Sequence, residues 1–256
     1  MQNAGTDADK GPLSSHRVGR DWSPTSYLAR NDLIFIDFDG TISVKDTGIA
    51  VIDALDLDEA WEVEHQWRRG EIDSMECLRR QWEMVDLPPA AIYRMIDSFE
   101  LDGGFNELAE AAIEIGAGLV VVSDGLDFYV DRMLGRLGWE TCPGETVLQR
   151  PRRCIPRYAN HAQVTDHGVK ITFPHRSPDC EQCGNCKAAR LMRLRPHFSR
   201  TIYIGDGHSD LCAARFADIV FAKDALAEDF ARAGRQFVRF DRLAEVNGVL
   251  LAPYKA

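Results

Sequence analysis

The fold is decided by one stretch of the chain, Leu33-Ile-Phe-Ile-Asp37-Phe-Asp39-Gly40-Thr41. A run of large and β-branched apolar residues that ends in a turn is typical of a buried central strand. Because side chains alternate along a strand, Asp37 and Asp39 lie on the same side of the chain, at the carboxyl edge where open α/β sheets place their ligands. The stretch therefore predicts an α/β sheet with two carboxylates at its ligand-binding edge.

A simpler interpretation is that the two acids only end the strand and begin a turn. Asp followed by Gly is common in turns, and this accounts for Asp39 and Gly40. It does not account for Asp37, because an ionised group inside an apolar run needs a partner, a metal or a catalytic role. The functional interpretation is therefore favoured.

Length and charge limit the class of protein. A chain of 256 residues suits one α/β domain with a sizeable insertion, and the net charge of −10 argues against a general nucleic-acid binder. We find no apolar run long enough to span a bilayer and no signal-peptide pattern in the first thirty residues. We therefore expect a soluble cytoplasmic protein without nucleic-acid or membrane partners, and the sequence carries no signal of its oligomeric state.

Periodicity divides the chain into three parts. Residues 1–30 are polar and aperiodic, which predicts a flexible leader. Residues 42–101 hold only helical stripes, which predicts a small all-helical cap, with Trp61, Trp67 and Trp82 in its core. Helices and buried strands alternate in the remainder, so residues 31–41 and 102–256 form a doubly wound, mainly parallel α/β sheet. Its further expected strands are 119–122, 201–204, 219–222 and 237–240, with a hairpin at 157–164 and 169–173.

Three of the buried strands end in polar clusters. Asp37 and Asp39 follow the first strand, Ser123 and Asp124 the second, and Asp206 with Asp210 the third. In a parallel sheet with right-handed crossovers these ends meet at one edge. Lys187, at a predicted helix start, adds a cation. Carboxylates, a hydroxyl and a cation together suit a phosphate group held with Mg²⁺.

The chemistry gives each acid a role. Asp37 is ionised at neutral pH and can attack phosphorus without a base, which forms an aspartyl-phosphate. Asp39 can protonate the leaving oxygen and later take a proton from water. The metal ligands are then the carboxylates of Asp37 and Asp206 and the main-chain carbonyl of Asp39. Asp210 is either a further metal ligand or a supporting group.

The remaining polar residues suit phosphate binding. The Ser123 hydroxyl and the amide of Asp124 can donate to phosphate oxygens, and Lys187 can neutralise charge that develops on them. Taken singly, Ser123 is a helix cap, Lys187 a surface lysine and Asp206 a turn residue. The functional interpretation is favoured because all of these explanations would have to hold at one sheet edge.

The order of these motifs resembles the haloacid dehalogenase superfamily of phosphohydrolases. Asp-Phe-Asp-Gly-Thr, then Ser123, then Lys187, then Gly205-Asp-Gly-His-Ser-Asp210 match its four motifs over residues 33 to about 240. The helical insertion after the first motif is similar to the small cap of the phosphoserine phosphatase branch. Tyr158-Ala-Asn-His161 and the cysteine-rich approach to Lys187 resemble the methionine-salvage phosphatases, whereas Ser123-Asp124 is closer to phosphoethanolamine and phosphocholine phosphatases.

The resemblance implies a Mg²⁺-dependent phosphomonoesterase that acts on a small phosphorylated metabolite. The leading substrate is the methionine-salvage enol-phosphate 2-hydroxy-3-keto-5-methylthiopentenyl-1-phosphate, with phosphoserine and phosphorylated amino-alcohols as alternatives. Two other classes stay open: a non-catalytic phosphate-binding regulator on this scaffold, and a phosphotransferase. Asp39 argues against the first, because binding alone does not need an acid/base group there.

Two further features of the sequence allow more than one interpretation. Cys180, Cys183 and Cys186 have the spacing of a zinc knuckle that Cys142, Cys154 or His175 could complete, but free thiols or a reversible disulfide fit the pattern equally. Arg68 and Arg69 either face the site and recognise an anionic group or form a solvated helix end.

Overall fold

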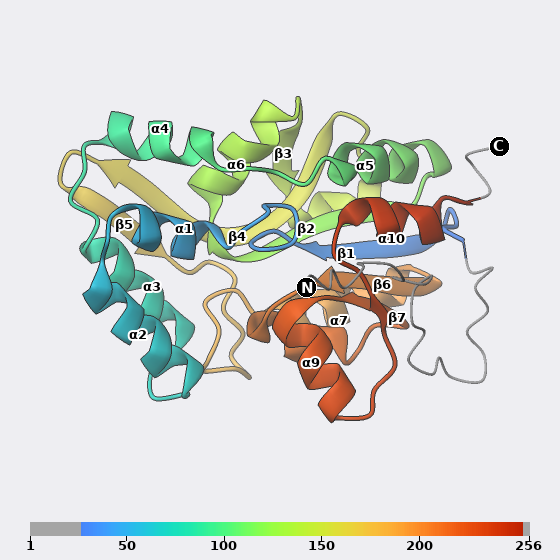
Figure 1. The fold of residues 1–256 in the computed structure, drawn as a ribbon. Helices are drawn as coiled ribbons and strands as arrows, with labels where there is room; N and C mark the ends of the chain where they lie inside the picture. The colour runs from blue at the N-terminus through green and yellow to red at the C-terminus, as the bar shows by residue number, and fades with distance from the viewer. Residues whose placement is uncertain (1–26, 253–256) are drawn as a thin grey trace, which may run out of the picture.

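The computed structural model describes residues 27–252 and has a single mixed sheet at its centre (Figure 1). The strand order is β3-β4-β2-β1-β6-β7-β8, all parallel, and β5 pairs antiparallel with β4 at the side. The strands are β1 (Asp32–Asp37), β2 (Gly118–Leu126), β3 (Glu140–Pro143), β4 (Cys154–Thr165), β5 (Gly168–Thr172), β6 (Arg200–Gly205), β7 (Ile219–Ala222) and β8 (Val238–Arg239).

Strand β1 is central and buried along its whole length, as its apolar run predicts. It lies between β2 and β6, with Asp37 opposite Val122 and Ile36 opposite Ile204. Alternate side chains enter the two hydrophobic cores on opposite faces of the sheet, Ile34 on one face and Phe35 on the other. The predicted doubly wound α/β class is confirmed.

Helices cover both faces of the sheet (Figure 1). Helices α5, α6 and α10 lie on one face, and α7 and α9 on the other, where α8 also packs. Their bounds are α5 (Gly104–Ile115), α6 (Asp127–Arg136), α7 (Lys187–Leu194), α8 (Leu211–Ala214), α9 (Asp224–Arg232) and α10 (Leu243–Leu250), with 3-10 turns η1 (Gly144–Gln149), η2 (Arg195–His197) and η3 (His208–Asp210). Among the described helices, none combines the length and apolar character needed to cross a membrane.

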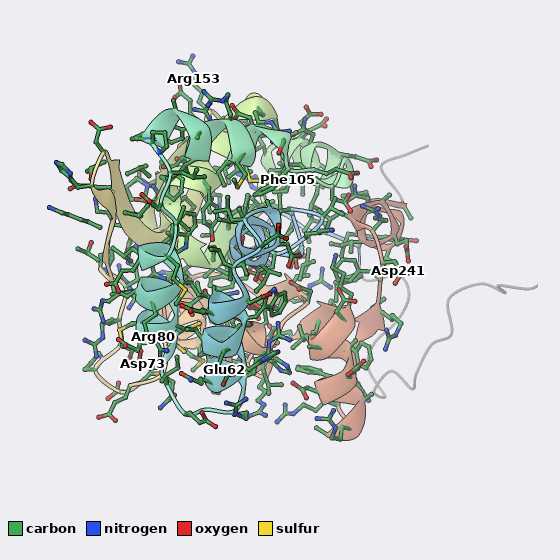
Figure 2. The ribbon with its side chains drawn as sticks, turned by 60° about the vertical axis from the view of Figure 1, so that its left-hand side comes forward. Glu62, Asp73, Arg80, Phe105, Arg153 and Asp241 are labelled. Carbon is green, nitrogen blue, oxygen red and sulfur yellow. A yellow bond between two sulfur atoms is a disulfide. The ribbon has the colours of Figure 1, made fainter. Side chains whose placement is uncertain are left out.

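The cap helices all follow β1 directly. They are α1 (Thr47–Ala54), α2 (Asp58–Arg68), α3 (Ser74–Glu83) and α4 (Pro89–Ser98). The Trp82 ring is buried and packs against Phe128 and Tyr129 of α6, which ties the cap to the core. Charged residues such as Glu62 and Arg80 lie along α2 and α3, while Phe105 of α5 points into the core (Figure 2).

The predicted leader lies mainly outside the described residues, which begin at residue 27. Within its last four residues, Leu28 is only 1% exposed and packs in the core. Its amide donates to the carbonyl of Leu250 at 3.0 Å. This short segment therefore joins the two ends of the described chain.

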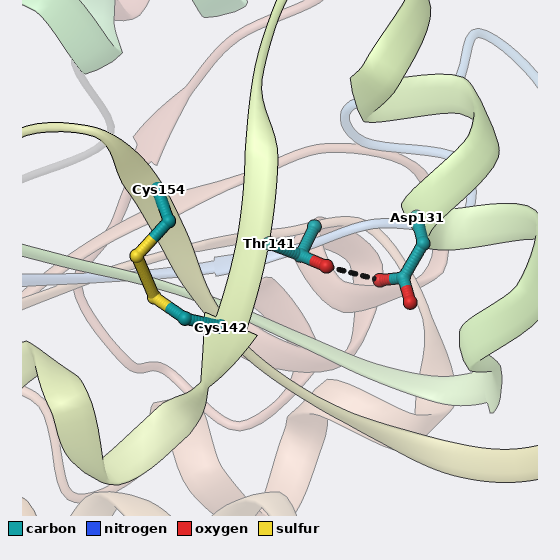
Figure 3. Close-up of a disulfide and its surroundings, with 4 residues drawn as sticks. All are labelled: Asp131, Thr141, Cys142 and Cys154. Carbon is teal, nitrogen blue, oxygen red and sulfur yellow. Dashed lines mark hydrogen bonds between the residues drawn. A yellow bond between two sulfur atoms is a disulfide. The ribbon is translucent and has the colours of Figure 1, made fainter.

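In the segment between α6 and α7, the structure confirms the predicted hairpin and adds one strand that the sequence did not predict. The hairpin forms as β4 and β5, with His161 opposite Thr172. The short strand β3 was not predicted, and its Cys142 forms a disulfide with Cys154 of β4 across 5.8 Å between the Cα atoms (Figure 3). Beside it Thr141 donates to Asp131 at 2.7 Å. The pairing corrects the expectation that Cys142 or Cys154 is free to bind zinc.

Candidate active site

The parallel sheet brings the sequence motifs to one edge. Asp37 is the last residue of β1, Ser123 and Asp124 lie near the end of the neighbouring β2, and Asp206 follows β6 on the other side. Lys187 is the first residue of α7 and is 3% exposed. The structure therefore assembles all of the predicted site residues at the carboxyl edge of the three central strands.

Lys187 is buried between two carboxylates. Its Nζ donates to Asp37 Oδ1 at 2.6 Å, to Asp210 Oδ1 at 2.7 Å and to Ser209 Oγ at 3.1 Å. Burial alone would lower the pKa of Lys187, but the charges of Asp210 and Asp37 outweigh it and raise the pKa above its ordinary value. Lys187 therefore carries a permanent positive charge beside Asp37.

The carboxylate of Asp37 has an excess of negative neighbours. Burial raises its pKa well above the ordinary value, the charge of Asp210 raises it further, and Lys187 opposes both. Burial and the charge of Asp210 likewise raise the pKa of Asp206 to about 7. One lysine does not balance three close carboxylates, so a further cation is electrostatically favoured here.

Asp37, Asp206 and Asp210 are the residues that fit a metal ion. One oxygen of each lies within 4.8 Å of the others, and among the described residues they form the one group of acidic, histidine or cysteine side chains this close. Carboxylate oxygens are the ligands that Mg²⁺ prefers. The residues present therefore fit the expected metal.

The loop after β1 is shaped to admit Asp206. Gly40 has a φ of +77°, and a Cβ at this position would lie 2.3 Å from Asp206 Oδ2. Thr41 donates from Oγ1 to Asp206 Oδ1 at 2.8 Å and orients the carboxylate. Both the backbone conformation and the space at position 40 thus require glycine.

Asp210 is fully enclosed and has partners at both oxygens. Tyr203 donates to Oδ1 at 2.6 Å, and the amides of Asp206 and Gly207 donate to Oδ2 at 3.1 and 3.0 Å. With Lys187 also on Oδ1, the carboxylate organises the loop after β6. This geometry favours the supporting role over direct metal ligation among the two roles that the sequence left open.

Asp39 is held by three donors. Its Oδ2 accepts from Ser123 Oγ at 2.7 Å and from the Tyr129 hydroxyl at 3.2 Å, and its Oδ1 accepts from the Thr47 amide at 3.2 Å. Tyr129 is a buried residue in the first half of α6. Because Thr47 begins α1, Asp39 links the core site to the first helix of the cap.

Ser123 and Asp124 connect the site to the loop before Lys187. The Asn185 amide donates to Asp124 Oδ1 at 2.8 Å, and the Asn185 side chain donates to the Ser123 carbonyl at 2.8 Å. Burial raises the pKa of Asp124, although these hydrogen bonds act in the opposite direction. Lys187 is thus positioned by β2 as well as by its own helix.

Part of this group forms the floor of a cavity of about 300 Å³ between core and cap: Asp37, Asp39, Asp124, Tyr129, Lys187 and Asp206. Ser123 and Asp210 are fully buried and do not line it. The cap contributes Glu64, which is 6% exposed and accepts from Arg68 Nε at 2.8 Å and from Gln81 Nε2 at 3.1 Å. Of the arginine pair, Arg68 lines the cavity, while Arg69 pairs with Glu62 and Glu71 on the exposed surface. Further cap residues on the wall are Asp46, Ile49, Trp67, Cys77 and Leu78.

The cavity also corrects smaller expectations. Of the three tryptophans expected in the cap core, Trp82 is buried where the cap meets α6, whereas Trp61 is partly exposed and Trp67 lines the cavity. His208 also borders the cavity, and its Nδ1 lies 3.2 Å from Asp229 Oδ2. Glu64 and Gln81 were missed because each sits within a helical stripe whose inward face the pattern does not distinguish from core.

The structure does not support the zinc site expected at Cys180, Cys183 and Cys186. Within residues 27–252 the cysteines form no group close enough to hold an ion, although Cys180 interacts with the thiols of Cys183 and Cys186. Cys142 and Cys154, two of the candidate fourth ligands, are bonded to each other.

Fold and site together define a hydrolase of the haloacid dehalogenase type. The family model for haloacid dehalogenase-like hydrolases matches residues 34–215, and the chain belongs to this family. Among curated proteins it is similar to the 2-hydroxy-3-keto-5-methylthiopentenyl-1-phosphate phosphatases of Bacillus cereus. The strain G9842 protein is 28% identical over 221 residues, 85% of this chain and 94% of the relative. The strain B4264 protein is 29% identical over 197 residues, 75% and 84%.

Solved structures agree on the fold. A haloacid dehalogenase family hydrolase from Salmonella enterica serovar Typhi superposes with a TM-score of 0.63 at 19% identity, over 87% of this chain and 72% of that chain. A substrate-bound phosphoserine phosphatase superposes with a TM-score of 0.61 at 19% identity, over 84% and 95%. Both likenesses confirm the α/β architecture.

Proposed function

We propose that the protein is a cytoplasmic, Mg²⁺-dependent phosphomonoesterase that acts through an aspartyl-phosphate on a small phosphorylated metabolite. One observation carries the proposal: Lys187 holds Asp37 at 2.6 Å on the floor of a cavity that also contains Asp39 and Asp206. A nucleophile, an acid/base group and a cation site thus face one enclosed space.

The first half-reaction transfers the phosphoryl group to Asp37. Lys187 engages Oδ1 of Asp37, so Oδ2 is the oxygen that attacks phosphorus. The new bond joins this oxygen to phosphorus, the bond to the leaving oxygen breaks, and Asp39 gives that oxygen its proton. Asp37, Asp206 and the main-chain carbonyl of Asp39 would hold a Mg²⁺ ion, which would supply neutralisation of negative charge when bound.

The second half-reaction returns the enzyme to its starting state. Asp39, now ionised, accepts a proton from water as the water oxygen bonds to phosphorus. The bond from phosphorus to Asp37 breaks and inorganic phosphate leaves. The Tyr129 hydroxyl keeps the Asp39 carboxylate in place through both steps. Ser123, the Asp124 amide and Lys187 donate hydrogen bonds to the phosphate oxygens.

The cap side of the cavity supports the methionine-salvage enol-phosphate as the leading substrate. Its wall combines apolar side chains, Ile49, Trp67 and Leu78, with the polar Arg68 and Gln81. The apolar part suits a methylthio chain, and the polar part suits hydroxyl and keto oxygens. The relatives named above for this activity agree with this choice.

A second candidate substrate class is a phosphorylated amine such as phosphoserine, phosphoethanolamine or phosphocholine. One observation favours it: Asp46, the N-cap of α1, presents an exposed carboxylate to the same cavity. A carboxylate at this position suits an ammonium group.

A phosphate-release screen over a panel of phosphorylated metabolites tests the proposal, with Mg²⁺ or with a chelator. We expect Mg²⁺-dependent release that is fastest, by kcat/KM, for the methionine-salvage enol-phosphate. The Asp37→Asn protein, prepared identically, controls for contaminating phosphatases. Release that persists in the chelator or in this variant contradicts the mechanism, and a preference for the amine panel selects the second candidate.

A further inference from the structure

The cysteines that lead into Lys187 form a contacting cluster of thiols. The sulfur of Cys180 hydrogen-bonds with the thiols of Cys183 and Cys186 and accepts from the amides of Gln182 and Cys183. Partial burial raises the pKa of Cys180, but these donors outweigh it and lower the pKa below the ordinary value. Burial raises the pKa of both Cys183 and Cys186. Cys180 therefore has the largest thiolate fraction of the three, and the thiolate is the form that attacks a disulfide.

Cys180 and Cys183 differ from Cys186 in their exposure to solvent. Cys180 and Cys183 are partly accessible to solvent, whereas Cys186 is buried and caps the start of α7, with its amide on the His175 carbonyl at 3.3 Å. A reagent in solution therefore reaches Cys180, and Cys183 is the neighbouring thiol in the same loop.

The loop also fastens the cap to the core. The Ser74 amide, at the start of α3, donates to the Gln182 carbonyl at 3.0 Å. The Gly184 amide donates to Ser74 Oγ at 2.9 Å, and the Ser74 hydroxyl also hydrogen-bonds to Asp124. Cys183 lies between the two loop residues that hold Ser74. A change of loop shape at Cys183 therefore reaches both the cap and the residues that position Lys187.

We propose that Cys180 and Cys183 form a thiol-oxidation site that takes a low-molecular-weight disulfide as oxidant and, once bridged, slows the enzyme. The effect on activity rests on the function proposed above, whereas the oxidation itself does not. Nothing in the phosphatase mechanism uses these thiols.

The exchange proceeds in two steps. The Cys180 thiolate attacks one sulfur of the reagent, the reagent S–S bond breaks, and one reagent thiolate leaves a mixed disulfide on Cys180. Cys183 then gives its proton to the released thiolate and attacks the Cys180 sulfur, which expels the second reagent thiolate. Two protein thiols are oxidised to one disulfide, and the reagent is reduced to two thiols.

Bridging changes the geometry of the loop. Two sulfurs in hydrogen-bond contact must approach to about 2.05 Å in a disulfide. Residues 181–183 move with them, which disturbs the Gln182 and Gly184 bonds to Ser74. Because Ser74 also lines the active-site cavity, we expect a loss of activity on the order of fivefold or more.

The test treats the full-length protein with oxidised glutathione and then alkylates the free thiols. In the tryptic peptide 177–187 we expect Cys180 and Cys183 to be protected and Cys186 to be alkylated. Cys183→Ser should retain glutathione on Cys180, because the resolving thiol is missing, and Cys180→Ser should show neither adduct nor bridge. Cys212→Ser, which removes an exposed thiol outside the loop, should behave as the parent.

Activity is measured on the same samples before and after dithiothreitol. We expect the loss and its recovery in the parent and in Cys212→Ser, and no loss in Cys180→Ser. Full alkylation of all three cysteines after treatment, a bridge to Cys186, or one tightly held zinc ion per chain would each overturn the assigned site. A Cys180–Cys183 bridge with unchanged activity overturns the regulatory effect. Peptide mapping tests whether the disulfide forms even if the protein turns over no substrate.

Discussion

The two walls of the active-site cavity are built differently. On the core side, Asp37 and Lys187 are each 3% exposed, and Lys187 donates to Asp37 at 2.6 Å and to the buried Asp210 behind the wall at 2.7 Å. On the cap side, Arg68 keeps 46% of its side chain exposed while it pairs with Glu64, and Asp46 is exposed. The core wall is buried and hydrogen-bonded, and the cap wall is more exposed to solvent.

This difference predicts which kinetic constant each wall determines. Buried, paired groups are preorganised for charge that develops in the transition state, so the core wall governs kcat. Exposed groups away from the reacting atoms bind the substrate in its ground state as well as in the transition state, so we expect the cap wall to govern KM. Variants of the two walls should therefore separate these constants.

The largest effect is expected for Asp37→Asn, which tests whether the core wall determines kcat. An amide of the same shape cannot form the aspartyl-phosphate, so we expect kcat to fall by about 10³-fold or more. Substrate binding, measured by calorimetry, should stay within about threefold of the parent, because the cap is unchanged. A kcat within tenfold of the parent would place the nucleophile elsewhere.

The next effect is expected at Lys187→Met. Removing the ammonium leaves Asp37 and Asp210 buried without their shared partner, so we expect about 3 kcal/mol lower free energy of unfolding in urea and about 10²-fold lower kcat. Mg²⁺ should restore part of the stability. The control Lys170→Met, on the exposed side of β5, should stay within about 0.5 kcal/mol of the parent. Equal unfolding curves for the two variants would show that the buried pair is not structural.

A matched pair of cap variants gives the third and smaller effect. Arg68 lines the cavity and Arg69 does not, so Arg68→Ala should raise KM by about tenfold with little change in kcat, and Arg69→Ala should change neither. Steady-state kinetics on the best substrate of the screen measures both constants. If the two variants behave alike, the cap wall does not recognise the substrate through Arg68.

The smallest effect is the pH dependence of metal stabilisation. The pKa of Asp206 is about 7 in the metal-free protein, above its value in an unfolded chain. Its contribution to stability is therefore complete at low pH and is lost as the pH rises through about 7. Mg²⁺ needs the ionised carboxylate, so the rise in Tm caused by Mg²⁺ should grow from about pH 5.5 to about pH 8.

Scanning fluorimetry with and without Mg²⁺ measures this rise, and Asp206→Asn serves as its control. The variant should show a small and nearly constant rise across the same range. A rise in the parent that is already complete at the acid end would contradict the role given to Asp206.

Sequence patterns predicted the core wall far better than the cap wall. Asp37, Ser123 and Asp206 follow strands, and the parallel arrangement of those strands fixes where their ends meet. Tyr129 and Glu64 lie inside helices. The inward face of a helix has the same sequence pattern whether it packs in a core or lines a cavity.

The edge of the sheet was harder to predict for a different reason. Strand β3 has four residues and little apolar character, and its pairing is set by β4 rather than by its own sequence. The Cys142–Cys154 disulfide depends on that pairing, so spacing along the chain could not separate it from a metal site.

The central claim is that Asp37 carries the phosphoryl group, and one measurement tests it directly. The enzyme is mixed with the best substrate and Mg²⁺, quenched in acid within one turnover, digested with pepsin at low pH and analysed by mass spectrometry. We predict a phosphoryl group on the peptide that contains residues 33–41, assigned to Asp37 and decaying at least as fast as kcat. Product formed in the first turnover without any phosphoryl group on this peptide would contradict the account.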